Sequence, residues 1–299
     1  MLAALSNDCG CANRQQRVKT NNLFRRGDGQ WVTLADLIQT MRTVGAHDCQ
    51  VLYMHTGLSF GQPNPELSRS ELLDTIYQAV RSLGVRTVCV PTFTFSFCNG
   101  EDYDVDRSKS RMGALNEYIR RRPEAIRSLD PLMSVAVVGE DRDLVENLGH
   151  ESTGTNSTFD KLSRRSGVKF LFLGVRLGDC FTYMHYLEWR EKVPYRYNRD
   201  FVGKIMQGNR SYDDTYTLFV RYRNVKPGTG SYVYEGLLAE RGALRAAPLG
   251  DNSIRCVSES DARELYIELL RKTPSFFIER PFSPQDADTT FVAHNMVAL

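Results

Sequence analysis

The 299-residue sequence carries almost no net charge, because its 38 lysine and arginine residues nearly balance its 36 aspartate and glutamate residues. A formal charge of +2 is too small to favour a nucleic-acid backbone or an anionic membrane as the partner. The sequence also lacks an apolar run near the roughly 20 residues that span a bilayer, and its start, MLAALSNDCGCANRQQRVK, lacks the apolar core of a secretory signal. We therefore expect a cytoplasmic protein with neither nucleic acid nor a membrane as its partner.

Cysteine is too scattered to indicate a disulfide framework or a metal site. The chain has seven cysteines, an odd number, and only Cys9 and Cys11 lie close together. Their spacing is not the CxxC spacing of a closed zinc site. Reduced thiols and no bound metal are the simplest interpretation.

Residues 1–30 lack any sustained apolar period and are rich in Asn, Arg and Gly. That composition is typical of a flexible N-terminal extension. The rest of the sequence shows neither a linker nor an internal repeat, and 41% of the whole chain is hydrophobic. We predict a single domain over residues 31–299.

The first part of this domain has the pattern of strands alternating with helices. Apolar residues recur at helical spacing over residues 34–44, and the run 50–55 is typical of a buried strand. Ser68 and Glu71 match the capping box of a second helix, and residues 87–90 form a short β-branched strand. A helix between two strands gives a crossover long enough for parallel pairing.

Later segments extend this pattern. Strands are predicted at residues 134–139 and 168–175, with helices at 112–122 and after Asp179. The fold class is therefore α/β, with a central, mostly parallel sheet flanked by helices.

Beyond about residue 200 the sequence changes character. Apolar and polar residues alternate in segments such as 215–222 and 231–238, and a helical pattern follows over about 259–272. We predict an antiparallel C-terminal subregion that completes the same domain.

Five segments of the chain stand out for their order and spacing. They are YMHTGLSFG (53–61), PTFTF (91–95), MGALNE (112–117), RSLDPLMSV (127–135) and TYMHYLE (182–188). In this order they resemble the aminoglycoside 3-N-acetyltransferase family over about residues 34–188, with a weaker likeness through VPYRY at 193–197. The resemblance implies an α/β acyltransferase that binds acetyl-CoA as a co-substrate and passes the acetyl group directly to an amine. The chain correspondingly shows no convincing GxGxxG loop between a strand and a helix.

His185 and Glu188 lie three positions apart on a predicted helix, so their side chains project from one face. An amine must lose a proton to become a nucleophile, and a neutral imidazole or a carboxylate can accept that proton. The resemblance implies that both residues are catalytic, whereas an isolated HxxE is more often a structural pair. Glu117 is expected beside the amine or beside His185, although a carboxylate near a helix start also stabilises the helix by itself.

The resemblance places acetyl-CoA at the ends of two predicted strands, where open α/β sheets bind ligands. The expected coenzyme-binding residues are His55, Thr56, Gly57, Ser59, Thr92, Phe93 and Ser134. Donors of the first segment would stabilise the thioester oxygen, and Thr92 and Phe93 would contact the pantetheine arm. A core histidine at position 55 and a turn with a buried aromatic residue at position 93 are the alternatives.

The chain departs from the family at one motif. Antibiotic-modifying members carry Arg-Ser-x-His-Pro-Thr-His-Ser, and Asp130 and Met133 stand here in place of the two histidines. This variant resembles the family branch associated with surface polysaccharide, so the expected acceptor is an amino sugar, free or nucleotide-linked. Asp130, Asp179 and Tyr183 are expected to bind it. Aminoglycoside modification and a catalytically silent CoA-binding scaffold are the alternatives.

Cys180 is a further nucleophile near His185, because a thiol beside Asp179 can carry an acyl group covalently. A cysteine at an apolar strand-to-helix junction is more often a packing residue, and the resemblance implies no acyl-enzyme. We therefore expect direct transfer. The sequence leaves the oligomeric state open, with a homo-oligomer as one option.

Overall fold

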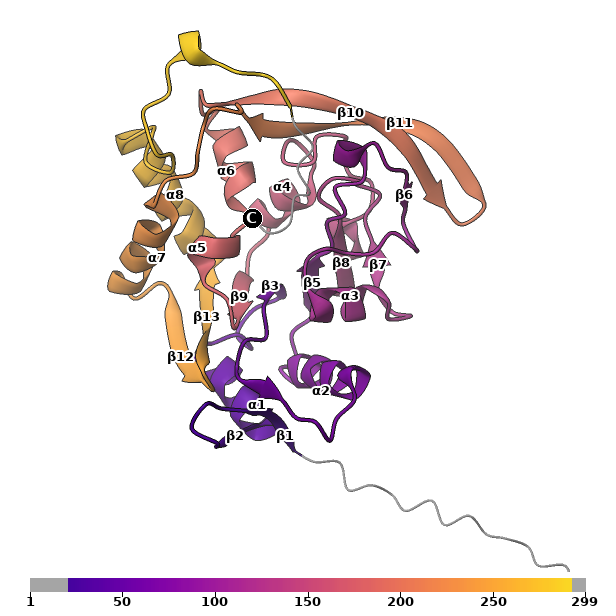
Figure 1. Ribbon diagram of the computed structural model, residues 1–299, viewed down its shortest axis with the longest axis vertical. Coiled ribbons are helices and arrows are strands. Elements are labelled where there is room, and N and C mark those ends of the chain that lie inside the picture. The colour runs from indigo at the N-terminus through magenta and orange to yellow at the C-terminus, as the bar shows by residue number, and fades with distance from the viewer. Residues whose placement is uncertain (1–20, 292–299) are drawn as a thin grey trace, which may run out of the picture.

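The computed structural model describes residues 21–291, so Cys9 and Cys11 lie outside the described part of the chain (Figure 1). At the centre is a seven-stranded sheet. Its strands, in spatial order, are β12 (Arg245–Leu249), β13 (Asn252–Ser258), β9 (Val168–Leu173), β3 (Val51–Thr56), β5 (Thr87–Pro91), β8 (Val135–Gly139) and β7 (Ile126–Arg127).

Parallel pairing is concentrated in the middle of this sheet. β3 pairs in parallel with β9 on one side and with β5 on the other, and the outer strands add antiparallel pairs on both flanks. Strands covered on both faces are apolar throughout, as residues 51–54 are. The predicted α/β fold class is confirmed, and β9, β3 and β5 all end at the same edge of the sheet.

Helices cover both faces of the sheet. They are α1 (Leu34–Thr43), α2 (Arg69–Arg81), α3 (Ala114–Arg120), α4 (Thr158–Ser163), α5 (Leu177–Cys180), α6 (Met184–Arg190), α7 (Gly230–Glu240) and α8 (Glu259–Lys272), with 3-10 turns at Phe97–Asn99, Arg142–Leu144 and Pro284–Asp286. The alternation along β3 sends Leu52 and Met54 into the core beneath α1, α2 and α3. Val51 and Tyr53 point into the core beneath α4, α6, α7 and α8.

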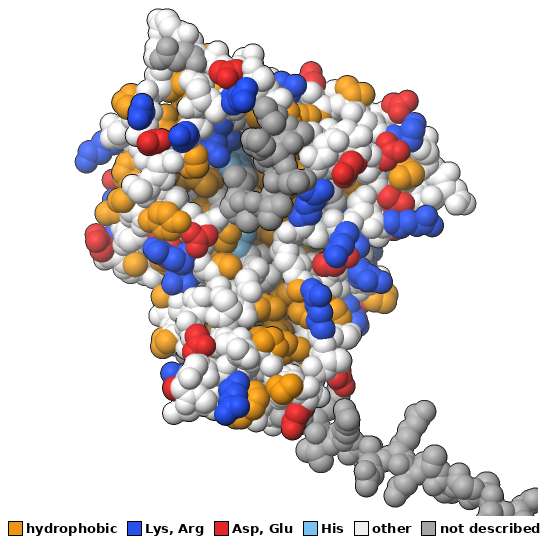
Figure 2. All heavy atoms as spheres, in the orientation of Figure 1, with side chains coloured by type: hydrophobic (Ala, Val, Ile, Leu, Met, Phe, Trp, Pro, Cys, Tyr) orange, Lys and Arg blue, Asp and Glu red, His pale blue; other side chains and the backbone are white. Residues whose placement is uncertain are grey.

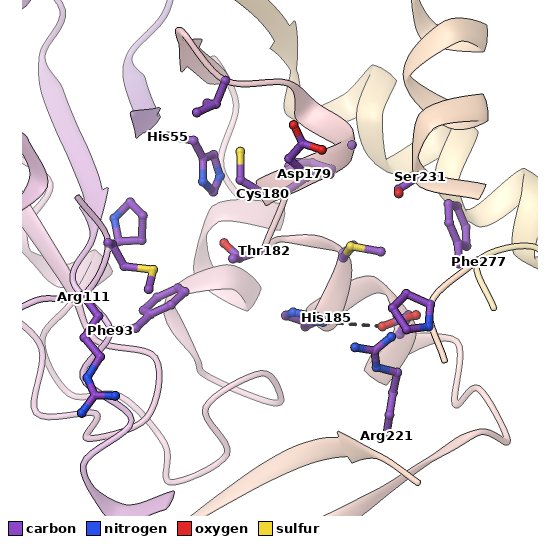
Figure 3. A pocket seen from close by; sticks show the side chains of 18 of the residues that line it. His55, Phe93, Arg111, Asp179, Cys180, Thr182, His185, Arg221, Ser231 and Phe277 are labelled. Atoms are coloured by element: carbon purple, nitrogen blue, oxygen red, sulfur yellow. Dashed lines mark ion pairs between the residues drawn. The ribbon is translucent and has the colours of Figure 1, made fainter. Parts of the chain in front are cut away.

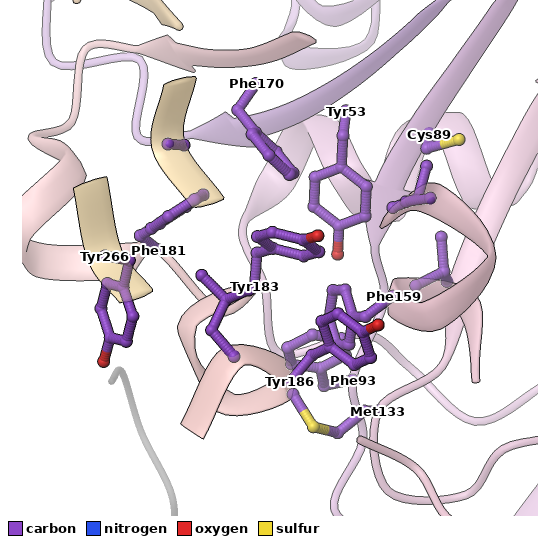
Figure 4. Packing of buried hydrophobic residues seen from close by; sticks show 14 of the residues in the cluster. Tyr53, Cys89, Phe93, Met133, Phe159, Phe170, Phe181, Tyr183, Tyr186 and Tyr266 are labelled. Carbon is purple, nitrogen blue, oxygen red and sulfur yellow. The ribbon is translucent and has the colours of Figure 1, made fainter. Parts of the chain in front are cut away.

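Aromatic rings fill this second core. The ring of Tyr53 lies 5.8 Å from that of Phe170 in β9 and 6.1 Å from that of Phe159 in α4 (Figure 4). Tyr183 and Phe181, in the segment between α5 and α6, pack 4.9 and 5.0 Å from Phe170. This packing fixes the start of α6 relative to the central strands.

Local signals set the ends of several helices. Thr33 and Asp36 form a capping box at the start of α1, and Ser68 and Glu71 form the predicted one at the start of α2. Such a cap stabilises a helix by roughly 1 kcal/mol. The helix predicted over about 259–272 has these bounds in the structure. Within residues 21–291, no helix has both the length and the apolar character that crossing a membrane requires.

The N-terminal boundary differs from the prediction. β1 (Asn22–Arg25) pairs antiparallel with β2 (Trp31–Thr33) and β4 (Gln62–Pro63) in a separate small sheet. Leu23 and Phe24 of β1 are buried. Two apolar residues in a polar stretch are too few to show a period, which is why the extension predicted over residues 1–30 included residues 22–30. Those residues belong to the fold.

A long hairpin confirms the antiparallel C-terminal subregion. β10 (Arg196–Gln207) and β11 (Arg210–Arg221) pair along their whole length and lie over one end of the molecule, and β6 (Tyr103–Asp104) joins β10 (Figure 1). At the open end of the hairpin, Arg196 lies directly opposite Arg221. β12 and β13 add a second antiparallel pair to the central sheet.

The alternating segment 231–238 is not a strand. It forms most of α7, in which Tyr234 and Leu238 are buried and Tyr232 and Val233 are exposed. Buried residues four positions apart fit a helical period as well as they fit strict alternation. A run this short could not distinguish the two.

Candidate active site

The parallel strands bring their carboxyl ends to one cavity. β3 ends at Thr56, β5 ends at Pro91 and the chain reaches Val175 just after β9. All three residues line a cavity of about 730 Å³ (Figure 3). On the face drawn in Figure 2, histidine side chains lie near the centre among apolar ones. Open α/β sheets bind ligands at this edge, so the cavity is the candidate active site.

The predicted pair of His185 and Glu188 lines this cavity. The two residues lie one turn apart in α6, where Tyr186 and Leu187 pack into the core behind them. The side chains of His185 and Glu188 are 12% and 2% exposed, and His185 Nδ1 lies 3.6 Å from Glu188 Oε2. The i, i+3 spacing therefore places both groups on one face of the helix, as the sequence predicts.

Arg196, the first residue of β10, connects the two. Its Nη2 lies 2.7 Å from Glu188 Oε2 and 2.9 Å from His185 Nδ1, and its Nη1 donates to the carbonyl of Phe219 at 2.9 Å. The hydroxyl of Tyr195 donates to Glu188 Oε1 at 2.7 Å. Glu188 is thus held by the first residue of β10 and by the residue that precedes it.

This environment sets the charge of both groups. Burial acts against the charge on Glu188, but Arg196, His185 and the Tyr195 hydroxyl outweigh it and hold the pKa of Glu188 at about 2. Burial and the positive charge of Arg196 lower the pKa of His185 to about 4. At neutral pH the pair is therefore an ionised carboxylate beside a neutral imidazole, which is the form that can accept a proton.

Arg196 also affects which nitrogen of His185 carries the proton. A guanidinium has only donors, so in contact with Arg196 the Nδ1 atom accepts and the ring proton lies on Nε2. In the other tautomer Nδ1 carries the proton toward Glu188 Oε2, which keeps its ion pair with Arg196. Only this second tautomer leaves Nε2 free to take a proton from a bound amine.

His55 also reaches the cavity, from the end of β3. Its side chain is 4% exposed and stacks on the ring of Phe172 at 5.2 Å. Burial lowers the pKa of His55 to about 3. Its Nε2 is buried and finds no hydrogen-bond partner within the described residues. A buried polar atom without a partner at a cavity wall is a candidate contact for a ligand.

Thr56, Phe93 and Asp179 line the same cavity. Thr56 Oγ1 donates to Asn116 Oδ1 at 2.8 Å, which connects the end of β3 to α3. Asp179 accepts a hydrogen bond from the Tyr232 hydroxyl at 2.7 Å. These three expected ligand-binding residues are therefore brought together with His185.

Two expected coenzyme contacts, Thr92 and Ser134, do not line the cavity. Both are fully buried, and Ser134 Oγ donates to the Thr92 carbonyl at 2.7 Å. Arg127 Nη2 donates to the same carbonyl at 2.6 Å. This network holds the loop after β5, which carries Phe93 and, with a φ of 56°, Phe95 into the cavity wall. The strand-end position predicted a site, but these two side chains face the core.

Gly57 and Ser59 lie beside the cavity rather than in its wall. A Cβ on Gly57 would come within 2.3 Å of Val175 Cγ1, so glycine allows the segments after β3 and β9 to approach closely. Ser59 Oγ donates to the carbonyl of Gly174 and accepts from Asn252 Nδ2 at 2.8 Å. Both residues fasten these two segments together.

Glu117 does not line the cavity, and its carboxylate contacts Arg120 and Ser110 rather than His185. Its carboxylate accepts from Arg120 Nε and Nη2 at 2.8 and 2.7 Å and from the backbone N–H of Ser110 at 2.9 Å. These donors occupy both oxygens, and together they lower the pKa of Glu117 although burial acts in the opposite direction. The expected catalytic role does not fit this position, which instead supports a structural role for Glu117 at the start of α3.

Asp130 and Tyr183, two expected substrate contacts, do not line the cavity either. Asp130 Oδ1 accepts from the backbone N–H groups of Leu132 and Met133 at 2.8 and 2.9 Å and from Ser152 Oγ at 2.9 Å. Burial raises the pKa of Asp130. Tyr183 is fully buried in the aromatic core, and its hydroxyl donates to Glu259 (Figure 4). Both side chains stabilise the fold locally.

Several cavity residues were not singled out from the sequence. They include Arg111, Asn116, Arg196 and Arg221. Asn116 lay within the MGALNE segment and Arg196 within the VPYRY segment, and these two motifs were the available signals. Arg221 lies at the end of a strand whose pairing with β10 no local pattern shows.

Cys180 lines the cavity, but its thiol is a poor nucleophile. Burial and the nearby carboxylate of Asp179 raise the pKa of Cys180 well above the ordinary value for a thiol. Sγ lies 3.2 Å from the carbonyl of Arg176. A protonated thiol does not attack a thioester at neutral pH, so this geometry favours direct transfer.

Comparison with known proteins identifies the family. The sequence model of the family described as aminoglycoside 3-N-acetyltransferase matches residues 71–271, which is more than half of the chain. The fold is similar to the structure "AAC-IIIb binary with CoASH", with a TM-score of 0.68 and 18% identity over 84% of this chain and 99% of that chain.

 It is also similar to "AAC-VIa bound to Sisomicin", with a TM-score of 0.67 and 17% identity over 80% of this chain and 97% of that chain. The YokD protein from Bacillus subtilis matches with a TM-score of 0.65 and 16% identity over 82% of this chain and 95% of that chain.

These solved structures share the fold at low sequence identity. No curated protein sequence matches the chain closely enough to count as a relative. The family match covers α2 to α8, and it therefore includes His185, Glu188 and Arg196. On the match of its sequence to the family model, this chain is an acetyltransferase that belongs to the aminoglycoside 3-N-acetyltransferase family.

Proposed function

We propose that the protein transfers the acetyl group of acetyl-CoA directly to an amine of an amino-sugar-containing acceptor, with His185 as the proton acceptor and Glu188 as its partner. The observation that carries the proposal is the placement of a neutral imidazole and an ionised carboxylate in one cavity, at the carboxyl ends of three parallel strands. A cytoplasmic location, where acetyl-CoA is available, is part of the proposal.

The cavity suits the thioester end of acetyl-CoA. Phe93, Phe95 and Phe181 provide apolar walls for the pantetheine arm. His55 Nε2 has no hydrogen-bond partner within the described residues. It is available to the thioester or to an amide group of the pantetheine arm. A structure of similar fold is described as a binary complex with CoASH, which supports the same donor here.

The chemical step needs one proton acceptor. The amine nitrogen attacks the thioester carbonyl, a C–N bond forms and the carbonyl oxygen becomes an oxyanion. His185 Nε2 takes a proton from the attacking nitrogen, and the resulting imidazolium is stabilised by Glu188, 3.6 Å from Nδ1. When the C–S bond breaks, the thiolate of CoA takes that proton and leaves as the free thiol.

The family description supports an aminoglycoside as the acceptor most directly, and a neighbour of similar fold is described as bound to sisomicin. Aminoglycosides are built from amino sugars, so a simpler amino sugar, free or nucleotide-linked, presents the same kind of nucleophile. Arg221, which lines the cavity and forms no ion pair within the described residues, favours the nucleotide-linked member of this second class over a polycation.

The test measures thiol release from acetyl-CoA with a panel of aminoglycosides and amino sugars, with the acetylated amine identified by mass spectrometry. We expect His185→Ala to lower kcat by about 10²- to 10⁴-fold. His47→Ala is the matched control, because His47 is exposed and lies outside the cavity. Absence of amine-dependent thiol release across the panel, or full activity of His185→Ala, would refute the proposal.

A further inference from the structure

Arg221 is an arginine in the cavity wall without a carboxylate of its own. It is the last residue of β11, and its side chain extends from that strand toward His185 (Figure 3). Across the described part of the chain, no acidic side chain forms an ion pair with its guanidinium and no group accepts a hydrogen bond from it. Its five donors are therefore available to a bound molecule.

The positive charge of Arg196 makes the position of the Arg221 guanidinium energetically unfavourable. Arg196 lies directly opposite Arg221 across the hairpin, and like charges at opposed positions repel. Glu188 pairs with Arg196 at 2.7 Å, so one carboxylate lies beside two guanidinium groups. Burial and the charge of Arg196 lower the pKa of Arg221, while Glu188 acts in the opposite direction. An anion from outside the protein would relieve this repulsion.

The other charges of the cavity do not supply that anion. Arg111 pairs with Glu101 at 3.9 Å and Arg196 pairs with Glu188, so Arg221 is the cavity arginine for which no ion pair is found within the described residues. Glu188 is paired with Arg196, and the second carboxylate, Asp179, is hydrogen-bonded to Tyr232. An acceptor that carries an oxyanion is therefore attracted to Arg221, whereas a cationic group is repelled by it.

We propose that Arg221 binds a carboxylate or phosphate group of the acetyl acceptor, and that it thereby selects anionic amino sugars. The proposal rests on the proposed function, because the amine must reach His185 while the anion of the same molecule reaches Arg221. A guanidinium binds such oxyanions through two parallel hydrogen bonds, which fixes the orientation of the acceptor as well as its charge.

The phosphates of CoA carry the same chemistry, but their position in the coenzyme disfavours them. The whole pantetheine arm separates them from the sulfur. A thioester that reacts beside His185 therefore holds its phosphates away from the residues next to His185. Arg221 lies directly opposite Arg196, whose Nη2 is 2.9 Å from His185 Nδ1, and this places Arg221 at the reacting end of the cavity.

The test compares matched acceptors in the wild-type enzyme and in Arg221→Gln. Glucosamine is the reference acceptor without an anionic group. Glucosamine 6-phosphate adds a phosphate, muramic acid adds a carboxylate, and kanamycin is a polycation. We expect the wild-type kcat/KM to be highest for one of the two anionic acceptors. Arg221→Gln should raise KM for that acceptor by about 10- to 100-fold and leave KM for acetyl-CoA and glucosamine within about twofold.

Two further variants separate a specific contact from a structural effect. Arg221→Lys keeps the charge and should recover part of the lost affinity. Arg223→Gln removes an exposed arginine outside the cavity and should behave as the wild type. A rise in KM for acetyl-CoA alone would assign Arg221 to the coenzyme phosphates, and equal losses for glucosamine and the anionic acceptors would assign it a structural role. Either result overturns the proposal, as does a wild-type preference for kanamycin.

A binding measurement with inorganic phosphate tests the anion site at Arg221 without requiring catalytic turnover. Inorganic phosphate, added at constant ionic strength, should raise the unfolding temperature of the wild type more than that of Arg221→Gln. If no acceptor releases thiol from acetyl-CoA, the proposed function fails, and the phosphate shift still reports on the anion site. Equal phosphate shifts in the two proteins would overturn the assignment of Arg221.

Discussion

Replacing Arg196 by glutamine removes the charge that connects Glu188 with His185. Glu188 is 2% exposed and lies 2.7 Å from Arg196, so the variant leaves a buried carboxylate whose remaining polar contacts are the Tyr195 hydroxyl and the imidazole of His185. Removing one partner of a buried ion pair costs roughly 3–5 kcal/mol. His185 meanwhile loses a positive charge that helps to hold its pKa at about 4, so we expect that pKa to rise toward its ordinary value of 6.5.

The pKa of Glu188 gives an independent value for the stability that its ionised form contributes. In the folded protein it is about 2, against an ordinary value of 4.5. At about 1.4 kcal/mol for each pKa unit, the ionised carboxylate contributes about 3 kcal/mol of stability. Because the folded pKa is the lower one, this contribution is fully present above pH 4.5 and is lost as the pH falls toward 2. We expect Arg196→Gln to reduce the free energy of unfolding by about 3 kcal/mol at neutral pH, and by less in acid.

Urea unfolding at several pH values, followed by the fluorescence of Trp31 and Trp189, measures the stability change. Arg210→Gln is the matched control, because Arg210 is exposed at the far end of the same hairpin. The second readout is the acid limb of kcat/KM, which reports the free enzyme's base and should move to higher pH in Arg196→Gln. A stability within about 0.5 kcal/mol of the wild type, or an acid limb that stays in place, would refute this account of Arg196.

Two further predictions follow from buried polar groups. His55 has a folded pKa of about 3 against an ordinary 6.5, so the unfolded state binds its proton more readily and stability should fall as the pH drops between these values. His55→Phe, which keeps a ring on Phe172, should flatten that part of the stability-pH curve, and an unchanged slope in urea unfolding would contradict it. Asp130→Ala removes the acceptor of three hydrogen bonds and should cost about 2–4 kcal/mol, with kcat and KM within about twofold of the wild type. A changed KM for the acceptor at unchanged stability would contradict this prediction and indicate that Asp130 binds the acceptor.

The sequence predicted those features that depend on neighbouring residues. The cap of α2 needs only Ser68 and Glu71, and the shared face of His185 and Glu188 needs only the helical period. The buried strands β3 and β9 were recognisable as apolar runs because helices cover both of their faces. These local signals were enough to predict an α/β fold with a site at the strand ends.

Other features depend on contacts between distant segments. Thr92 and Ser134 lie close to predicted strand ends, yet their hydroxyls bond within the core, and nothing local distinguishes a side chain that faces the core from one that faces a cavity. From the sequence, Tyr183 fitted stacking on a sugar ring equally well, but in the structure it packs in the aromatic cluster around Phe170. Arg221 becomes part of the site only because β11 pairs with β10.

The buried positions of Asp130 and Met133 bear on which acceptor the enzyme selects. The sequence-based expectation of an amino sugar rested on the replacement of two family histidines at these positions. Both residues are buried here, and neither side chain lines the cavity, so the replacement does not alter the charge that a substrate meets. The case for an acceptor other than a polycation therefore depends on the arginines of the cavity wall rather than on the altered motif.

Two of those arginines come from one structural element, which links catalysis to acceptor choice. Arg196 aligns Glu188 and His185, and Arg221 lies directly opposite it at the open end of the hairpin. Side chains along a strand alternate between its two faces, so a shift of one residue in the pairing of β10 with β11 would turn Arg221 away from the cavity while Arg196 stayed in place. Changes in the hairpin could therefore alter which acceptors bind without dismantling the catalytic pair.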